Sequence, residues 1–274
     1  MKKKVSKIDY SKAMLPRKRK EQFLDVFKMN YIVLLKCGLM TFLFFIPLIG
    51  FSFFMDFFYV SLLEHSTEEV EQTKMLFHYF FNIGLIIFSL VALIGITGSI
   101  HVIRNLIWGE GIFFKDDFVK GIKENIGKNL IFGAIFALLY ALAFFVSSLF
   151  PETIIAYFAL IMFALIFLPI FFWIILLNNT YNSKFGGLLK NGLFFYVKTI
   201  GWSILGILMT LILVGLITIP INLIWLKYII LTIYVVFVYP IVLLIFVLYS
   251  TSKFDAYINK DNYPDYYSRG LNID

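Results

Sequence analysis

The chain has 274 residues, of which 61% are hydrophobic and only 15% are charged. Soluble domains have about 45–50% apolar and roughly 25% charged residues, so this composition excludes a water-soluble fold. The single cysteine, Cys37, excludes an internal disulfide framework and a zinc cluster built from cysteines. The net charge of +7 belongs to a membrane protein whose basic residues set its orientation, and no nucleic acid is expected as a partner.

Six apolar segments are each long enough to cross a bilayer, because a span needs about 20 apolar residues. They cover residues 31–55, 77–103, 130–149, 154–177, 200–219 and 228–249. The sequence therefore predicts an all-α, polytopic membrane protein with about six transmembrane helices in one domain (31–250), after a basic N-terminal segment (1–30) and before a C-terminal tail (251–274). Pro47, Pro169 and Pro240 lie within spans. We expect kinks rather than breaks there, because neighbouring helices re-satisfy the freed carbonyl groups.

Lysine and arginine are distributed unevenly between the two sides of these spans. Ten of the 24 precede residue 31, and most others lie between the second and third spans, between the fourth and fifth, or in the tail. The three remaining connections hold only Lys74 and Lys227. Since basic connections stay inside the cell, both termini are predicted to be cytoplasmic. The basic cluster near the N-terminus is predicted to bind anionic lipid headgroups; its members are Arg17, Lys18, Arg19 and Lys20.

The longest predicted outer connection covers residues 56–74 and is acidic. It carries Asp56 and four glutamates. A solvated loop that is poor in lysine for topological reasons explains this charge better than a cation site. Ser66 and Thr67 are candidate caps for a short surface helix within it.

An internal repeat is visible on the predicted cytoplasmic side. Amphipathic stretches at 21–30, 113–128 and 181–198 each precede a pair of spans. In the first two, an asparagine is followed eight residues later by a glycine, Gly38 or Gly133. We interpret these stretches as three interfacial amphipathic helices, each followed by a helical hairpin.

The stretch after the second span carries the most informative motif. Arg104 is placed to bond the last carbonyls of its helix, and Gly109 to end that helix. Phe114, Phe118 and Ile122 then share one face of a predicted interfacial helix. The motif residues expected to form a cytoplasmic interaction site are Arg104, Gly109, Glu110, Asp117, Phe118, Gly121, Lys123 and Asn125.

These residues form the patterns R-x-L-x-x-G-E and F-x-x-D-F-x-x-G-x-K-E-N. In these motifs, and in the entry into the first span at residues 27–47, the chain resembles the YesL-like family of bacterial membrane proteins, over about a third of its length. The resemblance implies a multi-pass protein of the bacterial cytoplasmic membrane, often encoded beside carbohydrate ABC importers and membrane sensor kinases. It implies no established activity, catalytic residue or cofactor.

Three functions are compatible with the sequence. The preferred hypothesis is a non-enzymatic accessory subunit of a carbohydrate transport system, with the lipid bilayer, ABC transporter subunits or a sensor kinase as partners. An independent transporter or channel requires a polar cavity, for which Asn82, Ser89, Thr97, Ser147 and Thr218 are the scattered candidates. An enzyme acting on lipid-linked substrates requires converging acids or histidines at one interface, and single substitutions of Arg104, Glu110 and Asp117 that leave a lipid-modifying activity intact would reject it. No catalytic, cofactor or metal motif is recognised.

Overall fold

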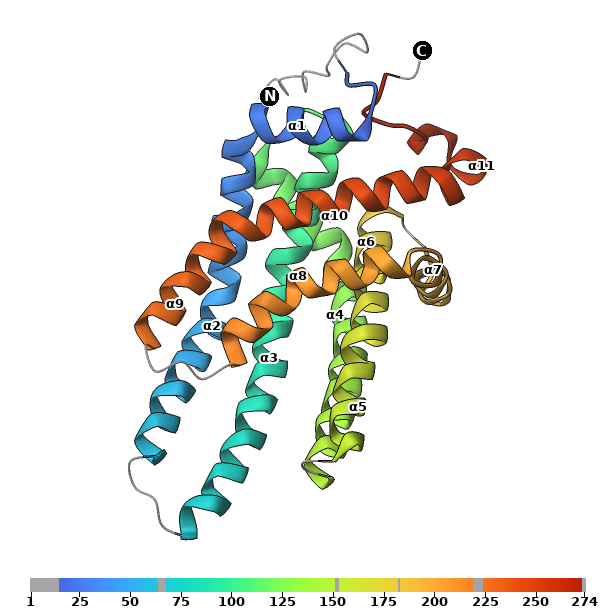
Figure 1. Ribbon diagram of the computed structural model, residues 1–274. Helices are drawn as coiled ribbons and strands as arrows, with labels where there is room; N and C mark the ends of the chain where they lie inside the picture. Colours follow the sequence, from blue (N-terminus) through green and yellow to red (C-terminus); the bar gives the residue numbers. More distant parts are fainter. Residues whose placement is uncertain (1–14, 64–67, 151–152, 182, 219–223, 273–274) are drawn as a thin grey trace.

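A computed structural model describes residues 15–63, 68–150, 153–181, 183–218 and 224–272, which are helical and contain no strand (Figure 1). The described elements are α1 (Arg19–Met29), α2 (Tyr31–Leu63), α3 (Glu68–Ile107), α4 (Phe114–Leu149), α5 (Ile154–Met162), η2 (Phe163–Phe167), α6 (Leu168–Thr180), α7 (Phe185–Lys198), α8 (Ile200–Thr218), α9 (Ile224–Ile233), η3 (Tyr234–Val238), α10 (Tyr239–Phe254), η4 (Asp255–Asn259), α11 (Lys260–Asn262) and η5 (Pro264–Tyr266). The all-α prediction is confirmed for this part of the chain.

Five helical segments are long and apolar enough to cross a membrane. They are Tyr31–Ser61, Leu76–Ile107, Phe114–Leu149, Ile154–Thr180 and Ile224–Asn262. These overlap the first four predicted spans and the sixth, so the chain is a multi-pass membrane protein. The predicted fifth span corresponds to the shorter helix α8, which is not among these five.

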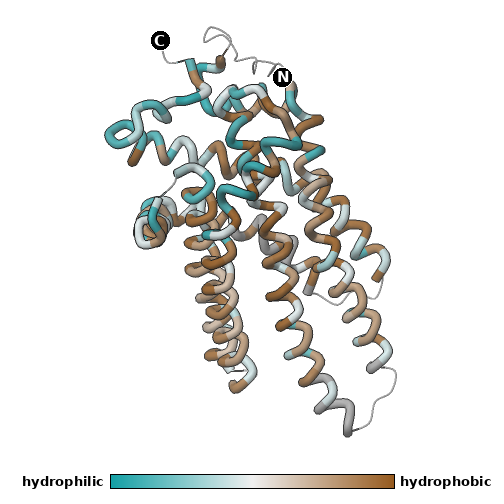
Figure 2. The backbone as a smooth tube through the Cα atoms, turned by 180° about the vertical axis from the view of Figure 1, so that it is seen from behind, coloured by the Kyte–Doolittle hydropathy of each residue, from teal (hydrophilic) through white to brown (hydrophobic). Residues whose placement is uncertain are grey.

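The helices form two groups with different directions. In Figure 1, α2, α3, α4 and the α5–α6 helix run alongside one another, whereas α8 and the α9–α10 helix cross them obliquely. Helix α10 contacts α2, α3 and α6, and α1 lies across the end of the bundle at which residues 15 and 272 are found. Figure 2 shows hydrophilic residues gathered at this end and hydrophobic residues along the shafts.

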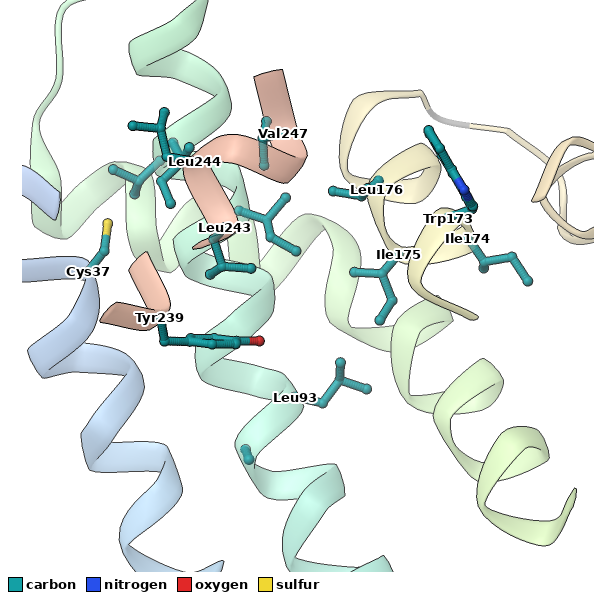
Figure 3. Close-up of a cluster of buried hydrophobic side chains, with 14 of the residues drawn as sticks. Cys37, Leu93, Trp173, Ile174, Ile175, Leu176, Tyr239, Leu243, Leu244 and Val247 are labelled. Carbon is teal, nitrogen blue, oxygen red and sulfur yellow. The ribbon is translucent and has the colours of Figure 1, made fainter. Parts of the chain in front are cut away.

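The apolar core lies where α10 crosses the long helices (Figure 3). Cys37 of α2, Leu93 of α3, Ile174 of α6 and Leu244 of α10 are each 5% exposed or less. Each comes from a different helix, so the crossing buries side chains from both groups. Trp173 is also part of this core, and its ring stacks on that of Phe195 of α7 with 5.0 Å between the centroids.

Of the three prolines that lie within predicted spans, two are preceded by a π-helical turn. Pro169 follows η2 and Pro240 follows η3, whereas Pro47 lies within the unbroken helix α2. Proline has no N–H to donate to the carbonyl four residues earlier. The hydroxyl of Tyr196 donates to that carbonyl, Leu165 O, at 3.1 Å. The helices therefore continue past both prolines through a widened turn, one of the local adjustments that membrane helices use.

Two predicted boundaries differ from the structure. The segment 113–128 is not a separate interfacial helix, because α4 runs without interruption from Phe114 through the predicted span. No proline or left-handed residue separates the two parts. The predicted outer connection is also shorter than 56–74, since α2 reaches Leu63 and α3 begins at Glu68. The candidate caps Ser66 and Thr67 lie outside the described residues.

Candidate functional site

The turn after α3 has the form predicted for Gly109. Its φ of 70° places it in the left-handed region, which glycine adopts without strain. The N–H of Gly109 donates to Leu106 O at 3.1 Å, and the N–H of Glu110 donates to Asn105 O at 3.0 Å. These two bonds make a Schellman motif, which ends the helix and turns the chain towards α4.

Arg104 has a different target from the predicted one. Its guanidinium donates to the carbonyl of Asn179 in the last turn of α6, rather than to the last carbonyls of its own helix. The same group contacts Asn105 Oδ1 at 2.9 Å and lies 4.5 Å from the centre of the Trp108 ring. A cation at a helix C-terminus is stabilised by the helix dipole. Arg104 therefore connects the end of α3 to the end of α6.

The first turns of α4 are fixed by the acidic and apolar residues of the motif. Asp117 is buried, and its Oδ2 accepts a hydrogen bond from Phe113 N at 2.8 Å, at the start of the helix. Phe118 is 1% exposed and lies against Phe44 and Phe114. A Cβ atom on Gly121 would lie 2.3 Å from Cβ of His101, so only glycine permits this crossing of α3 and α4.

A buried asparagine network joins α3, α4 and α6 beneath this turn. The side-chain N–H groups of Asn178 reach Asn125 O at 3.0 Å and Asn129 Oδ1 at 2.9 Å. Asn129 in turn donates to Thr97 Oγ1 at 2.9 Å, and Asn125 Nδ2 to Gly121 O at 3.0 Å. Sequence reasoning placed Asn125 in the site but missed the others. The available signal was the spacing of four between Asn125 and Asn129, which puts them on one helix face.

The N-terminal and C-terminal segments pack together against the turn. Gln22 is 2% exposed and its Nε2 donates to Ile107 O at 2.5 Å and Gly270 O at 2.9 Å. The N–H of Asn272 donates to Pro16 O at 3.0 Å. We call the assembly of residues 15–30, 104–121 and 255–272 the terminal cap. Its parts are far apart in sequence, so the cap is a product of the tertiary fold.

Ion pairs complete the terminal cap. Arg19 pairs with Asp255 at 2.5 Å, and Arg269 pairs with Glu110 at 2.7 Å. Burial lowers the pKa of the Arg19 guanidinium, an effect that Asp255 opposes. Arg269 also lies 4.6 Å from the centre of the Trp108 ring. Of the four residues predicted to bind headgroups, Arg19 is thus engaged in an ion pair inside the protein.

The basic side chains of the predicted site that remain at the surface lie just before α1, on α1 and on α4. Arg17, Lys18 and Lys20 are exposed, as is Lys123. On α4, Lys120 forms only a loose pair with Glu124, at 3.8 Å, and both side chains are more than half exposed. The solvent-exposed face of the first turns of α4 therefore presents charge beside the turn at residues 104–110, which we call the motif turn.

The opposite half of the bundle contains a buried ion pair that the sequence did not predict. Lys227 of α9 is 0% exposed, and its Nζ lies 2.5 Å from Oδ2 of Asp56 on α2. It also donates to Ile217 O at 3.0 Å, while the hydroxyl of Tyr228 donates to Asp56 Oδ2 at 2.8 Å. Both charges were expected in outer connections. Instead they join two helices.

A cavity of about 450 Å³ lies between the two groups of helices. Its walls are mostly aliphatic and aromatic, with contributions from α2 to α6, α8 and α10. In Figure 3, Tyr239, Leu93 and Ile175, all of which line it, point towards the space between α3 and α6. Of the polar residues considered for a channel, Ser89 lines the cavity, whereas Thr97 is bonded within the asparagine network.

The residues considered for an enzyme each have a partner within the terminal cap or at a helix end. Arg104, Glu110 and Asp117 contact a helix end, Arg269 and a backbone N–H respectively. Among the described residues, no three His, Cys, Asp or Glu side chains are grouped so as to hold a metal ion. Comparison with protein-family models, with curated proteins and with solved structures gives no match.

Proposed function

We propose that the chain is a non-enzymatic, multi-pass subunit of the bacterial cytoplasmic membrane that assists a transport system, and that it contacts its partner through the terminal cap. The observation that carries this proposal is the construction of the cap. Both terminal segments, the motif turn and, through Arg104, the end of α6 are joined by buried and part-buried polar contacts. Such a preorganised surface reduces the ordering cost of binding another protein. The resemblance to YesL-like proteins supports a carbohydrate importer as the partner.

The lining of the cavity supports this function over a channel. A conducting path for a polar solute requires polar groups along it. The side chains around the cavity are mainly apolar, and its Tyr140 hydroxyl already donates to Asn82 Oδ1 at 2.5 Å.

We further propose that α8 is a sixth span and that the terminal cap is cytoplasmic. An even number of crossings returns the chain to its starting side, and the Asn272–Pro16 hydrogen bond holds the two terminal segments together. Helix α8 has 19 residues and measures about 28 Å at 1.5 Å per residue, close to the ~30 Å of a hydrocarbon core. The bias of lysine and arginine towards this end supports a cytoplasmic position.

Epitope tags placed at residues 1 and 274 test this topology. We expect both tags to resist protease added to intact cells and to become accessible only after the cells are opened. A tag between residues 64 and 67 is the matched control and should be cleaved in intact cells. Cleavage of either terminal tag in intact cells would contradict the six-span arrangement.

Charge reversal on α4 tests the partner-binding role. The variant Lys120→Glu/Lys123→Glu alters exposed side chains beside the motif turn, and Lys190→Glu/Lys198→Glu makes the same change on exposed positions of α7. We expect native purification in mild detergent, followed by mass spectrometry, to recover importer subunits with the unaltered protein. The α4 variant should retain about tenfold less of these importer subunits, which is equivalent to a loss of ~1.4 kcal/mol in binding free energy. Recovery of no transport subunit, or equal losses in both variants, would reject the proposal.

A further inference from the structure

The apolar cavity is large enough to hold a ligand. Its volume of about 450 Å³ is within the roughly 300–1,000 Å³ of small-molecule and cofactor sites. It is about three times the ~150 Å³ of an engineered apolar cavity that stays dry and binds benzene. An occupant would gain contacts with walls that otherwise face empty space.

The chemistry of the walls favours a hydrocarbon chain. Leu93, Phe136, Phe163 and Phe246 are typical of the lining. Two of the polar groups around the cavity already have partners inside the protein. Trp173 Nε1 donates to Ser203 Oγ at 2.9 Å, and the Tyr140 hydroxyl donates to Asn82. The walls therefore offer an occupant extensive apolar contact and few free hydrogen-bonding groups.

The position of the cavity identifies the source of that chain. Ser89 and Trp202 line the cavity and are also exposed at the surface of the helices, Trp202 by 48%. The cavity thus borders the surface of the helices at each of these residues. Ser89 lies near the middle of the Leu76–Ile107 span. At that depth a bilayer contains hydrocarbon, not headgroups or water.

We propose that this cavity binds one acyl chain of a bilayer phospholipid, which enters from the lipid phase beside Ser89 and Trp202 and packs between α3, α4 and η2. The headgroup stays outside, at the membrane surface. The bound chain also contacts the lining residues of α8 and α10, and it thereby bridges the long helices and the oblique helices across the space that their own side chains leave unfilled.

Photocrosslinking of the full-length protein tests the proposal. The probe is phosphatidylethanolamine with a diazirine near the end of one acyl chain, in vesicles of phosphatidylethanolamine and phosphatidylglycerol. Ala137 lines the cavity, whereas Ala134, one turn earlier on α4, is exposed at the surface. The variant Ala137→Phe fills the cavity, and Ala134→Phe adds the same ring outside it. Mapping of the labelled peptides by mass spectrometry gives the readout.

We expect labelling of the lining positions on α3 and η2 in the unaltered protein and in Ala134→Phe, and about tenfold less in Ala137→Phe, the change produced by ~1.4 kcal/mol. Labelling of outward-facing positions should be the same in all three. If Ala137→Phe fails to fold, Ala164→Leu on η2 makes a smaller filling change at another lining position. Equal labelling of the lining positions with and without the filling residue would overturn the proposal. So would recovery of an isoprenoid or quinone, rather than phospholipid, from the purified protein.

Discussion

Replacing Asp56 alone with alanine is expected to lower the free energy of unfolding by about 3–5 kcal/mol, the typical cost of removing one partner from a buried ion pair. Lys227 is 0% exposed, so its ammonium would remain in an apolar environment without a counter-charge. It would retain only the Ile217 carbonyl among the partners described above. Tyr228 would also lose the carboxylate to which it donates. The measurement is the unfolding of the purified protein in one detergent, monitored through the helical signal in circular dichroism.

The matched control removes both charges at once. In Asp56→Leu/Lys227→Leu no buried charge is left unpaired, and replacing a buried pair with apolar residues is often neutral or stabilising. We expect this double variant to be at least as stable as the unaltered protein, to within about 1 kcal/mol. If the double variant lost as much stability as Asp56→Ala, the cost would come from lost packing rather than from the isolated charge.

The Asp56–Lys227 pair shows that the sequence predicts membrane spans but not which charged residues pair between them. Apolar segments of about 20 residues identify membrane helices because the bilayer itself imposes that length. The overlap of the predicted spans with five long helices follows from this requirement. The partner of a charge follows from packing, however, and these two residues are 171 positions apart. Each charge near the end of a span was therefore assigned to a loop, where isolated charges are normally solvated.

The motif turn illustrates the same division at the candidate site. Gly109 was predicted to end its helix, and its left-handed backbone and Schellman bonds confirm that local prediction. Arg104 was predicted to bond the end of its own helix, but the carbonyl it contacts belongs to Asn179, 75 residues away. Local capping rules identify a residue suited to a helix end without saying which helix end lies nearby. The contacts of Gln22 and Asp255 in the terminal cap have no local signal at all.

The sequence pattern also did not predict that α4 is one continuous helix. The change from amphipathic to uniformly apolar residues near Lys128 was interpreted as a boundary between an interfacial helix and a span. Composition changes there, but no residue breaks the backbone hydrogen bonding, so α4 continues. The prolines show the converse case. Pro169 and Pro240 were expected to disturb their helices, but the form of the disturbance, a π-helical turn, depends on the neighbours available to the freed carbonyls.

Gly38 lies where α2 approaches the backbone of one of these π-helical turns, η3. A Cβ atom at this position would lie 2.0 Å from Val236 O and 2.8 Å from a ring carbon of Pro240. The carbonyl belongs to the backbone of η3, four residues before Pro240, where that proline cannot supply a hydrogen bond. Relief of the clash therefore requires movement of a whole helix rather than a change of rotamer.

Gly38→Ala is accordingly expected to cost about 3 kcal/mol, at the upper end of typical overpacking effects. Gly50 provides the matched control on the same helix, since a Cβ atom there meets nothing within 4 Å. Gly50→Ala should raise the free energy of unfolding by roughly 0.5–1 kcal/mol, because alanine restricts the unfolded chain more than glycine does. Unfolding of both variants in one detergent should thus shift in opposite directions. Equal behaviour of the two alanines would show that α2 does not approach η3 as closely as the structure places it, and the oblique crossing of α9–α10 over α2 would then need revision.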